Sequence, residues 1–264
     1  MNKRPSFPTR LDFSPAKPSA SRASLQPVRA APGTRAKAPL GAPPHGFGLD
    51  SSAIRRTMVQ RLAGLGITNA SVLAAMQTIE RHRFVDSALV NQTYEETSLP
   101  IGLGQTISKP AVVARMLELL CQGAQAKLGR VLEIGTGCGY QAALLGLLAQ
   151  EVYSMERVRG LHERARDNLR HLRMANLHLL FGDGMAGYPR GAPYAGVIAA
   201  AGGHEVPSAW TDQLAIGGRL VAPVSAGAGA AAQQALVVID KTAQGLRRTV
   251  LEAVHFVPLK SGLA

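Results

Sequence analysis

The second half of the chain contains short apolar runs separated by polar or glycine-rich stretches. Five of these runs are interpreted as buried strands: residues 131–134, 151–157, 177–181, 194–201 and 219–224. The Ala/Leu-rich segment 141–149 lies between the first two strands and predicts a helix. Continuous apolar strands that alternate with helices are typical of a parallel sheet covered on both faces. Residues 235–240 and 250–257 predict a final antiparallel pair, and residues 227–232 before it predict a flexible loop.

Two helices are predicted ahead of the sheet. Residues 51–65 begin with serines that suit an N-cap, and Ser71 is expected to cap a second helix that runs to about Glu80. A loop over residues 94–107 follows these helices. We therefore expect a small N-terminal helical cap region in front of the sheet.

Ser108 lies at the expected start of the next helix, which is predicted to run to Leu120. Pro110 suits the first turn of a helix, and a serine just before that turn suits the N-cap. The Ser108 hydroxyl would then lie at the positive end of the helix, where an anionic carboxylate is stabilised. The alternative is that Ser108 is only a helix cap.

The first strand runs directly into a glycine-rich loop. Glu133 is followed by Gly135, Gly137 and Gly139 at alternate positions. Glycine lets the backbone turn tightly and approach a ligand closely. A dinucleotide-binding loop has the spacing G-x-G-x-x-G and holds a pyrophosphate, but Tyr140 occupies the position of its third glycine. The spacing therefore favours S-adenosylmethionine, which has no pyrophosphate, and a purely structural turn is the alternative.

Two further strands end in an acidic residue. Glu156 ends the second strand and is placed to accept hydrogen bonds from ribose hydroxyls, because ligands bind at the carboxyl ends of parallel strands. Asp183 lies between two glycines after the third strand and is expected to reach an adenine amino group. A helix N-cap and a turn former are the respective alternatives. With the glycine loop, these acids predict an α/β fold with a doubly wound, mostly parallel sheet of class I S-adenosylmethionine-dependent methyltransferase type.

Composition divides the chain into a tail and one domain. Residues 1–50 are rich in Pro, Ala, Ser and Arg, and carry eight Lys or Arg against two acidic residues, half of the formal net charge of +12. Such a segment cannot bury enough apolar surface to offset the entropy of ordering, so we expect a disordered basic tail. Residues 51–264 are expected to form the methyltransferase domain, with the helical cap and substrate loop in 51–110 and the cofactor-binding sheet in 111–264.

The cysteines and the hydropathy favour a cytoplasmic protein. Cys121 and Cys138 are far apart and match no zinc or disulfide pattern, which indicates a reducing compartment. No window of about 18 apolar residues free of charge is present, so no membrane span is expected. The N-terminal stretch lacks the apolar core of a secretory signal, and its prolines and glycines disfavour the amphipathic helix of an import signal.

The chain also resembles a family, the protein-L-isoaspartate O-methyltransferases, over roughly residues 55–260. The block LPIGLGQTIS at residues 99–108 is the family-specific part of the resemblance. Other matching blocks occur more widely among methyltransferases: residues 131–143, 155–157, 182–184, 217–224 and 256–259. The resemblance implies methylation of the α-carboxylate of L-isoaspartyl residues in damaged proteins, which starts their repair through a succinimide.

The motifs and the resemblance together assign a site. The residues expected to bind S-adenosylmethionine are Glu133, Gly135, Thr136, Gly137, Gly139, Glu156, Arg157, Asp183 and Gly184. The resemblance implies that Ser108 is the catalytic residue and binds the substrate together with Ile107 and Lys109. Isoaspartyl-containing proteins and peptides are the expected partners of a monomer that needs no metal and binds neither a membrane nor a specific nucleic acid.

Some positions depart from the family pattern. Lys109 stands where the family usually has Gln or a small residue, which puts substrate preference in question. Glu80 and Asp86 stand where prolines are common, and Ala195 replaces an Asp often found in the fourth strand.

An RNA methyltransferase and a small-molecule methyltransferase are the alternative functions. Basic charge supports the first, but residues 199–203 read AAAGG where enzymes that methylate base amines carry an Asp/Asn-Pro-Pro-aromatic motif. Neither cysteine has the context of the nucleophile of a cytosine C5 methyltransferase. A small-molecule enzyme would leave the block at residues 99–108 unexplained.

Overall fold

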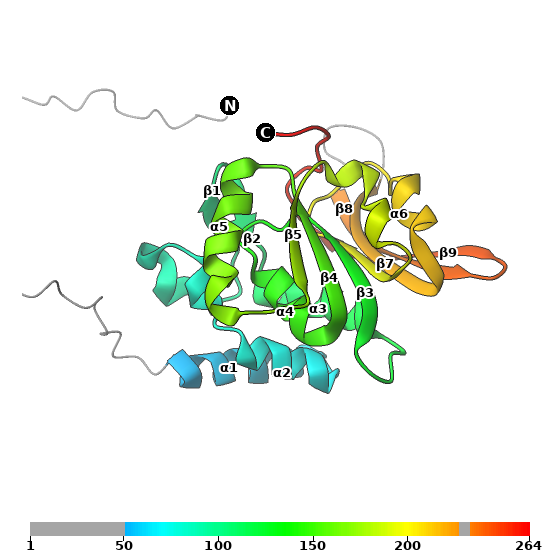
Figure 1. Ribbon diagram of the computed structural model, residues 1–264. Coiled ribbons are helices and arrows are strands. Elements are labelled where there is room, and N and C mark those ends of the chain that lie inside the picture. Colours follow the sequence, from blue (N-terminus) through cyan, green and yellow to red (C-terminus); the bar gives the residue numbers. More distant parts are fainter. Residues whose placement is uncertain (1–50, 227–232) are drawn as a thin grey trace, which may run out of the picture. The chain divides into compact units, whose positions relative to one another are not determined.

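The computed structural model describes residues 51–226 and 233–264. The predicted disordered tail and the predicted loop 227–232 lie outside the described residues. Within these ranges seven strands form one sheet in the order β5-β4-β3-β6-β7-β8-β9 (Figure 1). The strands are β3 Leu128–Ile134, β4 Ala149–Glu156, β5 Leu177–Phe181, β6 Tyr194–Ala199, β7 Leu214–Ala226, β8 Gln233–Thr242 and β9 Gly245–Val254. The first five are parallel, and β8 and β9 are antiparallel to their neighbours.

Apolar side chains of the sheet alternate between its two faces. The helices are α1 Ser51–Gly64, α2 Ala70–Thr78, α3 Pro110–Cys121, α4 Tyr140–Leu148, α5 Arg159–Leu169 and α6 Ser208–Asp212. Val131 and Val152 belong to the buried cluster that includes side chains of α1 to α5. Leu132 and Val197 face the other way and pack with Trp210 of α6. The mostly parallel sheet with helices on both faces confirms the predicted fold class.

The N-terminal helices α1 and α2 share the core of the sheet, because Met58 and Val72 are fully buried in the same cluster. The expectation that Ser71 caps the second helix is wrong. The N-cap is Asn69, whose side-chain oxygen accepts hydrogen bonds from the backbone N–H groups of Ser71 and Val72 at 3.0 and 3.1 Å. This helix ends at Thr78, two residues before the expected Glu80.

Two predicted boundaries shift because of strand pairing. Ala149 begins β4 and does not end the preceding helix, since it pairs with Leu128 of β3. The fourth strand of the prediction, β6, stops at Ala199, and Gly202 beyond it forms an isolated bridge with Pro258. The final antiparallel pair is confirmed as β8 and β9, although β9 begins at Gly245 and ends at Val254, earlier at both ends than the predicted 250–257.

A β-hairpin lies inside the region predicted as a loop. Strands β1 Leu99–Gly102 and β2 Gln105–Ile107 pair antiparallel. The tip residues Leu103 and Gly104 both have positive φ, 52° and 70°, as a two-residue type I′ turn requires. The hairpin leads directly to Ser108.

Helix α3 begins one residue later than expected. Its N-cap is Lys109, which makes no side-chain capping bond, so the prediction of Ser108 as the cap is wrong. The first turn is instead satisfied by Glu96, whose carboxylate oxygens accept a hydrogen bond from the N–H of Ala111 at 3.2 and 3.3 Å. The positive helix end thus already holds an acidic side chain of this chain.

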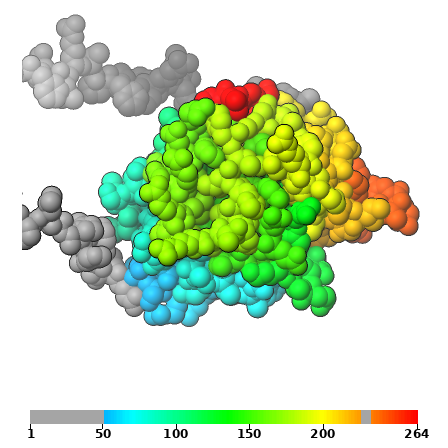
Figure 2. Space-filling view, in the orientation of Figure 1, coloured from blue at the N-terminus to red at the C-terminus, as the bar shows by residue number. Residues whose placement is uncertain are grey.

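The C-terminal segment returns to the edge of the sheet where the parallel strands end. Ala264 donates to the carbonyl of Arg157 at 2.9 Å, and its own carbonyl accepts from the N–H of Arg159 at 2.8 Å. Figure 2 shows these last residues, in red, packed onto the surface of the domain. The segment therefore reaches the loop between β4 and α5.

Candidate active site

The glycine loop between β3 and α4 adopts the conformation that its sequence predicts. Gly135, Gly137 and Gly139 have φ values of 91°, 57° and 92°, which residues other than glycine rarely adopt. A Cβ atom on Gly139 would lie 2.8 Å from Cδ1 of Leu169. The loop is therefore held to glycine by backbone geometry and, at Gly139, also by packing.

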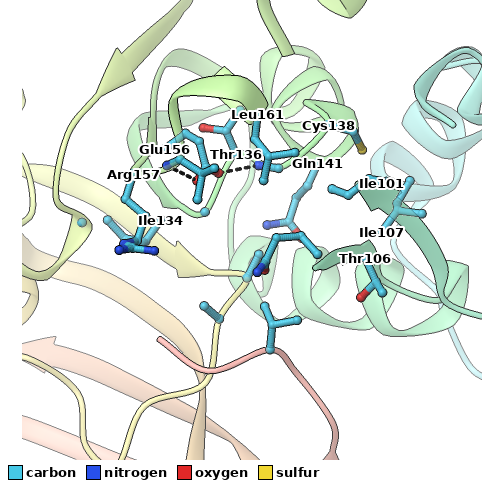
Figure 3. A pocket seen from close by; sticks show the side chains of 18 of the residues that line it. Ile101, Thr106, Ile107, Ile134, Thr136, Cys138, Gln141, Glu156, Arg157 and Leu161 are labelled. Carbon is cyan, nitrogen blue, oxygen red and sulfur yellow. Dashed lines mark hydrogen bonds between the residues drawn. The ribbon is translucent and has the colours of Figure 1, made fainter. Parts of the chain in front are cut away.

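A cavity of about 440 Å³ lies next to this loop. Its wall is built from the glycine loop, the end of β4, the start of α5, the β1–β2 hairpin and the C-terminal segment (Figure 3). The predicted site residues in the wall are Ile107, Ser108, Gly135, Thr136, Gly137, Glu156, Arg157 and Gly184. The predicted site residues that do not line the cavity are Lys109, Glu133, Gly139 and Asp183.

Glu156 joins the two loops at the cavity wall. Its Oε2 accepts a hydrogen bond from the N–H of Gly137 at 2.8 Å, and its Oε1 accepts one from the N–H of Val158 at 2.9 Å (Figure 3). The side chain is buried, with an exposed fraction of 5%. Each carboxylate oxygen has a further lone pair, so the group can still accept hydrogen bonds from a ligand in the cavity.

Asp183 is directed to the chain itself. Its Oδ1 accepts from the N–H of Met185 at 2.9 Å, and its Oδ2 accepts from the N–H of Gly262 at 2.6 Å. The following residue, Gly184, lies in the cavity wall. The Asp183 carboxylate thus fixes the turn after β5 and holds the C-terminal segment over the strand ends.

Glu133 is fully buried behind the glycine loop. The Ser154 hydroxyl donates a short hydrogen bond to its Oε2, and the Thr136 hydroxyl lies 2.6 Å from that of Ser154. The pKa of Glu133 is raised to about 8, mainly by burial and to a smaller extent by the Glu156 carboxylate, against the lowering effect of hydrogen bonds from the Ser154 and Gln141 side chains. Glu133 is therefore mostly neutral at pH 7. It supports the glycine loop through the Ser154 and Thr136 hydroxyls.

Gln141 is a wall residue that the sequence analysis did not select. It is nine-tenths buried, lines the cavity and has an amide nitrogen with no hydrogen-bond partner among the described residues (Figure 3). The amide also lies close enough to Glu133 to lower the pKa of that carboxyl group by hydrogen bonding, so it is shared between Glu133 and the cavity. A polar residue in the first turn of an otherwise Ala/Leu-rich helix was the signal that could have identified it.

Ser108 is positioned through its backbone. Its carbonyl accepts a hydrogen bond from Nη2 of Arg81 at 2.7 Å, while Nε of the same guanidinium donates to the carbonyl of Thr93 at 2.8 Å. Arg81 is fully buried, lies 4.9 Å over the ring of Tyr140, and forms no ion pair within the described ranges. Desolvation lowers the pKa of this guanidinium. Arg81 thus ties the cap region to the segment that carries Ser108.

The C-terminal segment closes one side of the cavity. Residues 257–260 and Ala264 line it. The Arg157 guanidinium reaches across to this segment, where its Nε donates to the carbonyl of Gly262 at 2.7 Å. Arg157 was predicted to bind the cofactor, whereas residues 257–264 were given no function, and only 256–259 matched the family in sequence.

A family model described as Protein-L-isoaspartate(D-aspartate) O-methyltransferase (PCMT) matches residues 53–264. The chain belongs to this family. The resemblance found in the sequence blocks is thereby confirmed.

Full-length relatives within the family agree with this assignment. A protein-L-isoaspartate O-methyltransferase of Methylibium petroleiphilum is 54% identical, over 98% of this chain and 96% of the relative. One of Leptothrix cholodnii is 57% identical, over 82% of this chain and 77% of the relative. The similarity thus covers the cap, the hairpin and the sheet together.

Solved structures of the family share the fold. A protein-L-isoaspartate O-methyltransferase matches with a TM-score of 0.70 at 28% identity, over 79% of this chain and 67% of the other. A putative one from Plasmodium falciparum, solved in complex with S-adenosyl-L-homocysteine, matches with a TM-score of 0.67 at 22% identity, over 78% of this chain and 98% of the other.

The described residues contain neither a metal-ligand cluster nor a membrane-spanning helix. No cluster of three or more His, Cys, Asp or Glu side chains in residues 51–226 and 233–264 is arranged to hold a metal ion. No helix in those ranges is long and apolar enough to cross a membrane.

Proposed function

We propose that this chain transfers a methyl group from S-adenosylmethionine to the α-carboxylate of L-isoaspartyl residues, and so starts their repair through a succinimide. The family match over residues 53–264 supports the reaction. The observation that carries the site is a single cavity whose wall contains both the glycine loop with Glu156 and the family-specific segment with Ser108.

The residues in the wall fit the cofactor. The loop glycines leave the backbone open, Glu156 keeps free lone pairs for the ribose hydroxyls, and Gln141 adds a buried polar side chain beside Glu133 to the wall. Gly184 lies where the adenine edge is expected, while Asp183 acts through the turn that it stabilises. We assign Gly135, Thr136, Gly137 and Arg157 to the same site, and Glu133 and Gly139 to its support.

Ser108 is proposed to orient the substrate carboxylate. No described residue forms a hydrogen bond with its hydroxyl, so the group is free to donate to an incoming ligand. S-adenosylmethionine supplies the electrophilic methyl group when bound. A peptide α-carboxyl group has a reference pKa of about 3.3–3.7, so it is ionised at neutral pH and needs no general base. The chain contributes alignment and exclusion of water by apolar wall residues such as Ile107 and Ile134.

Lys109 is assigned no contact with the reacting carboxylate. It is exposed and does not line the cavity, so any contact with substrate would involve the peptide outside the reacting carboxylate. We also propose a cytoplasmic monomer without a specific nucleic-acid partner, and the two buried free cysteines fit a reducing compartment.

A methyl-transfer assay tests this function. Labelled S-adenosylmethionine is offered with an isoaspartyl peptide, the matching aspartyl peptide and bulk RNA. We expect strong labelling of the isoaspartyl peptide alone, and equal labelling of both peptides or preferential labelling of RNA would refute the proposal. Ser108→Ala should lower kcat while the affinity for S-adenosylhomocysteine stays unchanged, because the hydroxyl contacts the substrate and not the cofactor.

A further inference from the structure

The tip of the β1–β2 hairpin carries an unfavourable residue. Gly102, Leu103 and Gly104 have consecutive positive φ values of 88°, 52° and 70°. Two-residue hairpin turns of this type prefer Asn-Gly or Asp-Gly, because Asn and Asp tolerate the left-handed region better than a leucine does. Leu103 therefore makes the hairpin less stable than a turn-forming residue would.

Packing within the chain does not account for this leucine. The side chain of Leu103 is 63% exposed, so it gains little from burial. Its Cδ1 atom does rest on Gly160 in the first turn of α5, where an added Cβ would lie 2.9 Å away. A strained residue with little packing gain indicates a functional contact.

Leu103 belongs to the cavity wall. It lines the cavity, as do Val158 and Leu161, and the Gly160 that its Cδ1 contacts lies between these two residues in the sequence, shortly after Glu156. Exposed apolar surface at the rim of a cavity becomes buried when a ligand fills it. The part of the cofactor expected nearest to Leu103 is the ribose, whose hydroxyls would donate hydrogen bonds to Glu156.

The hairpin is fastened to α5 at a second point. Nη1 of Arg164 donates to the carbonyl of Ile101 at 2.6 Å, and Nη2 of the same side chain bonds Oδ1 of Asp86 at 3.0 Å. The position of the hairpin over α5 is therefore fixed by Arg164. Leu103 is then held at the cavity rim without having to anchor the hairpin itself.

We propose that Leu103 is a cofactor-retaining residue that covers the ribose side of bound S-adenosylmethionine or S-adenosylhomocysteine. Its side chain bridges from the hairpin to Gly160 and closes the rim beside Glu156. The contact with the cofactor offsets the strain at the turn. This proposal rests on the proposed function only in taking the cofactor to bind beside Glu156.

The substitution Leu103→Asn separates the two roles of the residue. Asparagine suits the turn, so the thermal midpoint of unfolding should stay equal or rise. Loss of the apolar contact should raise the Kd for S-adenosylhomocysteine about three- to tenfold and speed its dissociation by a similar factor. Calorimetry measures the Kd, and stopped-flow displacement measures the dissociation rate.

Two further variants make the result decisive. Leu103→Gly also accepts positive φ and should repeat the loss of affinity. Leu246→Asn removes a leucine that is 53% exposed, lies in β9 and does not line the cavity, so the Kd should not change.

The outcomes distinguish a failure of the role proposed for Leu103 from a failure of the proposed function. A wild-type Kd and dissociation rate in both Leu103 variants would overturn the proposal, and a higher peptide KM with a wild-type Kd would show that Leu103 contacts the peptide instead. A wild-type chain that fails to bind S-adenosylhomocysteine would refute the proposed function and not the inference alone. Isoaspartyl methylation by the wild-type chain is measured separately.

Discussion

At the scale of single residues, carboxylates in similar sequence settings have different environments. Glu156 and Asp183 each accept one backbone N–H on each carboxylate oxygen, but Glu156 lines the cavity and Asp183 does not. Glu156 ends β4 and Asp183 comes two residues after β5, and the sequence predicted a direct contact with the cofactor for each. The difference comes from the C-terminal segment, which only the folded chain brings to Asp183.

Glu156→Ala should weaken binding of S-adenosylhomocysteine by about 1.5–3 kcal/mol, the usual contribution of a hydrogen bond to a charged group. The substitution also frees the N–H groups of Gly137 and Val158, so the loop loses a constraint. Calorimetry on the variant measures the change. Glu163→Ala is the matched control, since Glu163 is exposed on α5 and does not line the cavity. Equal affinities in both variants would contradict the assignment.

Glu133 predicts a dependence of stability on pH. Its pKa is about 8 in the folded chain against an ordinary value of 4.5, so the folded state holds a proton that the unfolded state releases between these values. The contribution of this group to stability is fully present below pH 4.5 and is lost as the pH rises through about 8. Urea unfolding of the wild type should therefore give a lower free energy of unfolding at pH 9 than at pH 6. The Glu133→Gln variant should show a smaller decrease between the same two pH values. An equal decrease in the free energy of unfolding for the wild type and the variant would argue against a neutral Glu133.

At the scale of elements, the hydrophobic pattern predicted the strands of the seven-stranded sheet and helices α1 to α4, but not the β1–β2 hairpin, α5 or α6, nor the details that tertiary contacts decide. Ser71 and Asn69 are both good N-cap residues, and sequence alone does not separate them. Glu118 of α3 decides between them, because its Oε1 accepts from the N–H groups of Thr68 and Asn69 at 2.6 and 3.0 Å and fixes the backbone before α2. Sequence alone also did not predict the cap of α3. Ser108 was expected to cap this helix, but the Glu96 carboxylate accepts the hydrogen bond from the first turn instead.

The junction between β2 and α3 depends on Arg81. Arg81→Lys keeps the charge but cannot donate to the carbonyls of Thr93 and Ser108 together, because an ammonium lacks the planar fork of a guanidinium. We expect the free energy of unfolding to fall by about 1.5–3 kcal/mol, one hydrogen bond from a charged donor. The peptide KM should rise while the Kd for S-adenosylhomocysteine stays constant, because the displaced residue is Ser108.

Arg83→Lys is the control for this prediction. Arg83 is 51% exposed and pairs with Glu80 at the surface, so its replacement should leave stability and KM close to wild type. Denaturant unfolding and steady-state kinetics on both variants provide the comparison. A stable Arg81→Lys variant with an unchanged peptide KM would show that Ser108 is positioned by other contacts.

At the scale of the whole molecule, the site is assembled from segments that are far apart in sequence. The glycine loop and Glu156 were predictable because each follows its own strand, and parallel strands end at one edge of the sheet. Ile107 was predicted as a site residue through the resemblance, but the rest of the hairpin, Gln141 and residues 257–264 were given no part in the site, since their place at the cavity depends on packing between distant segments. Local sequence therefore predicted the cofactor half of the site better than its enclosure.

The charge of the whole chain leads to the last prediction. Residues 1–50 carry half of the formal net charge of +12, and their composition does not support a packed core. A chain of residues 51–264 should therefore fold and methylate an isoaspartyl peptide with the kcat of the full chain. Nonspecific retention on RNA at low salt should fall in the shorter chain, because cationic groups bind the phosphate backbone by releasing counterions.

A full-length chain with the eight Lys and Arg of the tail replaced by Gln is the matched control. It should lose RNA retention as the truncated chain does, since charge and not the presence of the segment causes the binding, and it should keep the same kcat. Retention is measured by filter binding over a salt series, where the slope of log affinity against log salt becomes shallower as phosphate contacts are lost. A truncated chain that folds but loses most of its kcat would show that the tail contributes to the site, and undiminished retention would place the RNA-binding charge on residues 51–264.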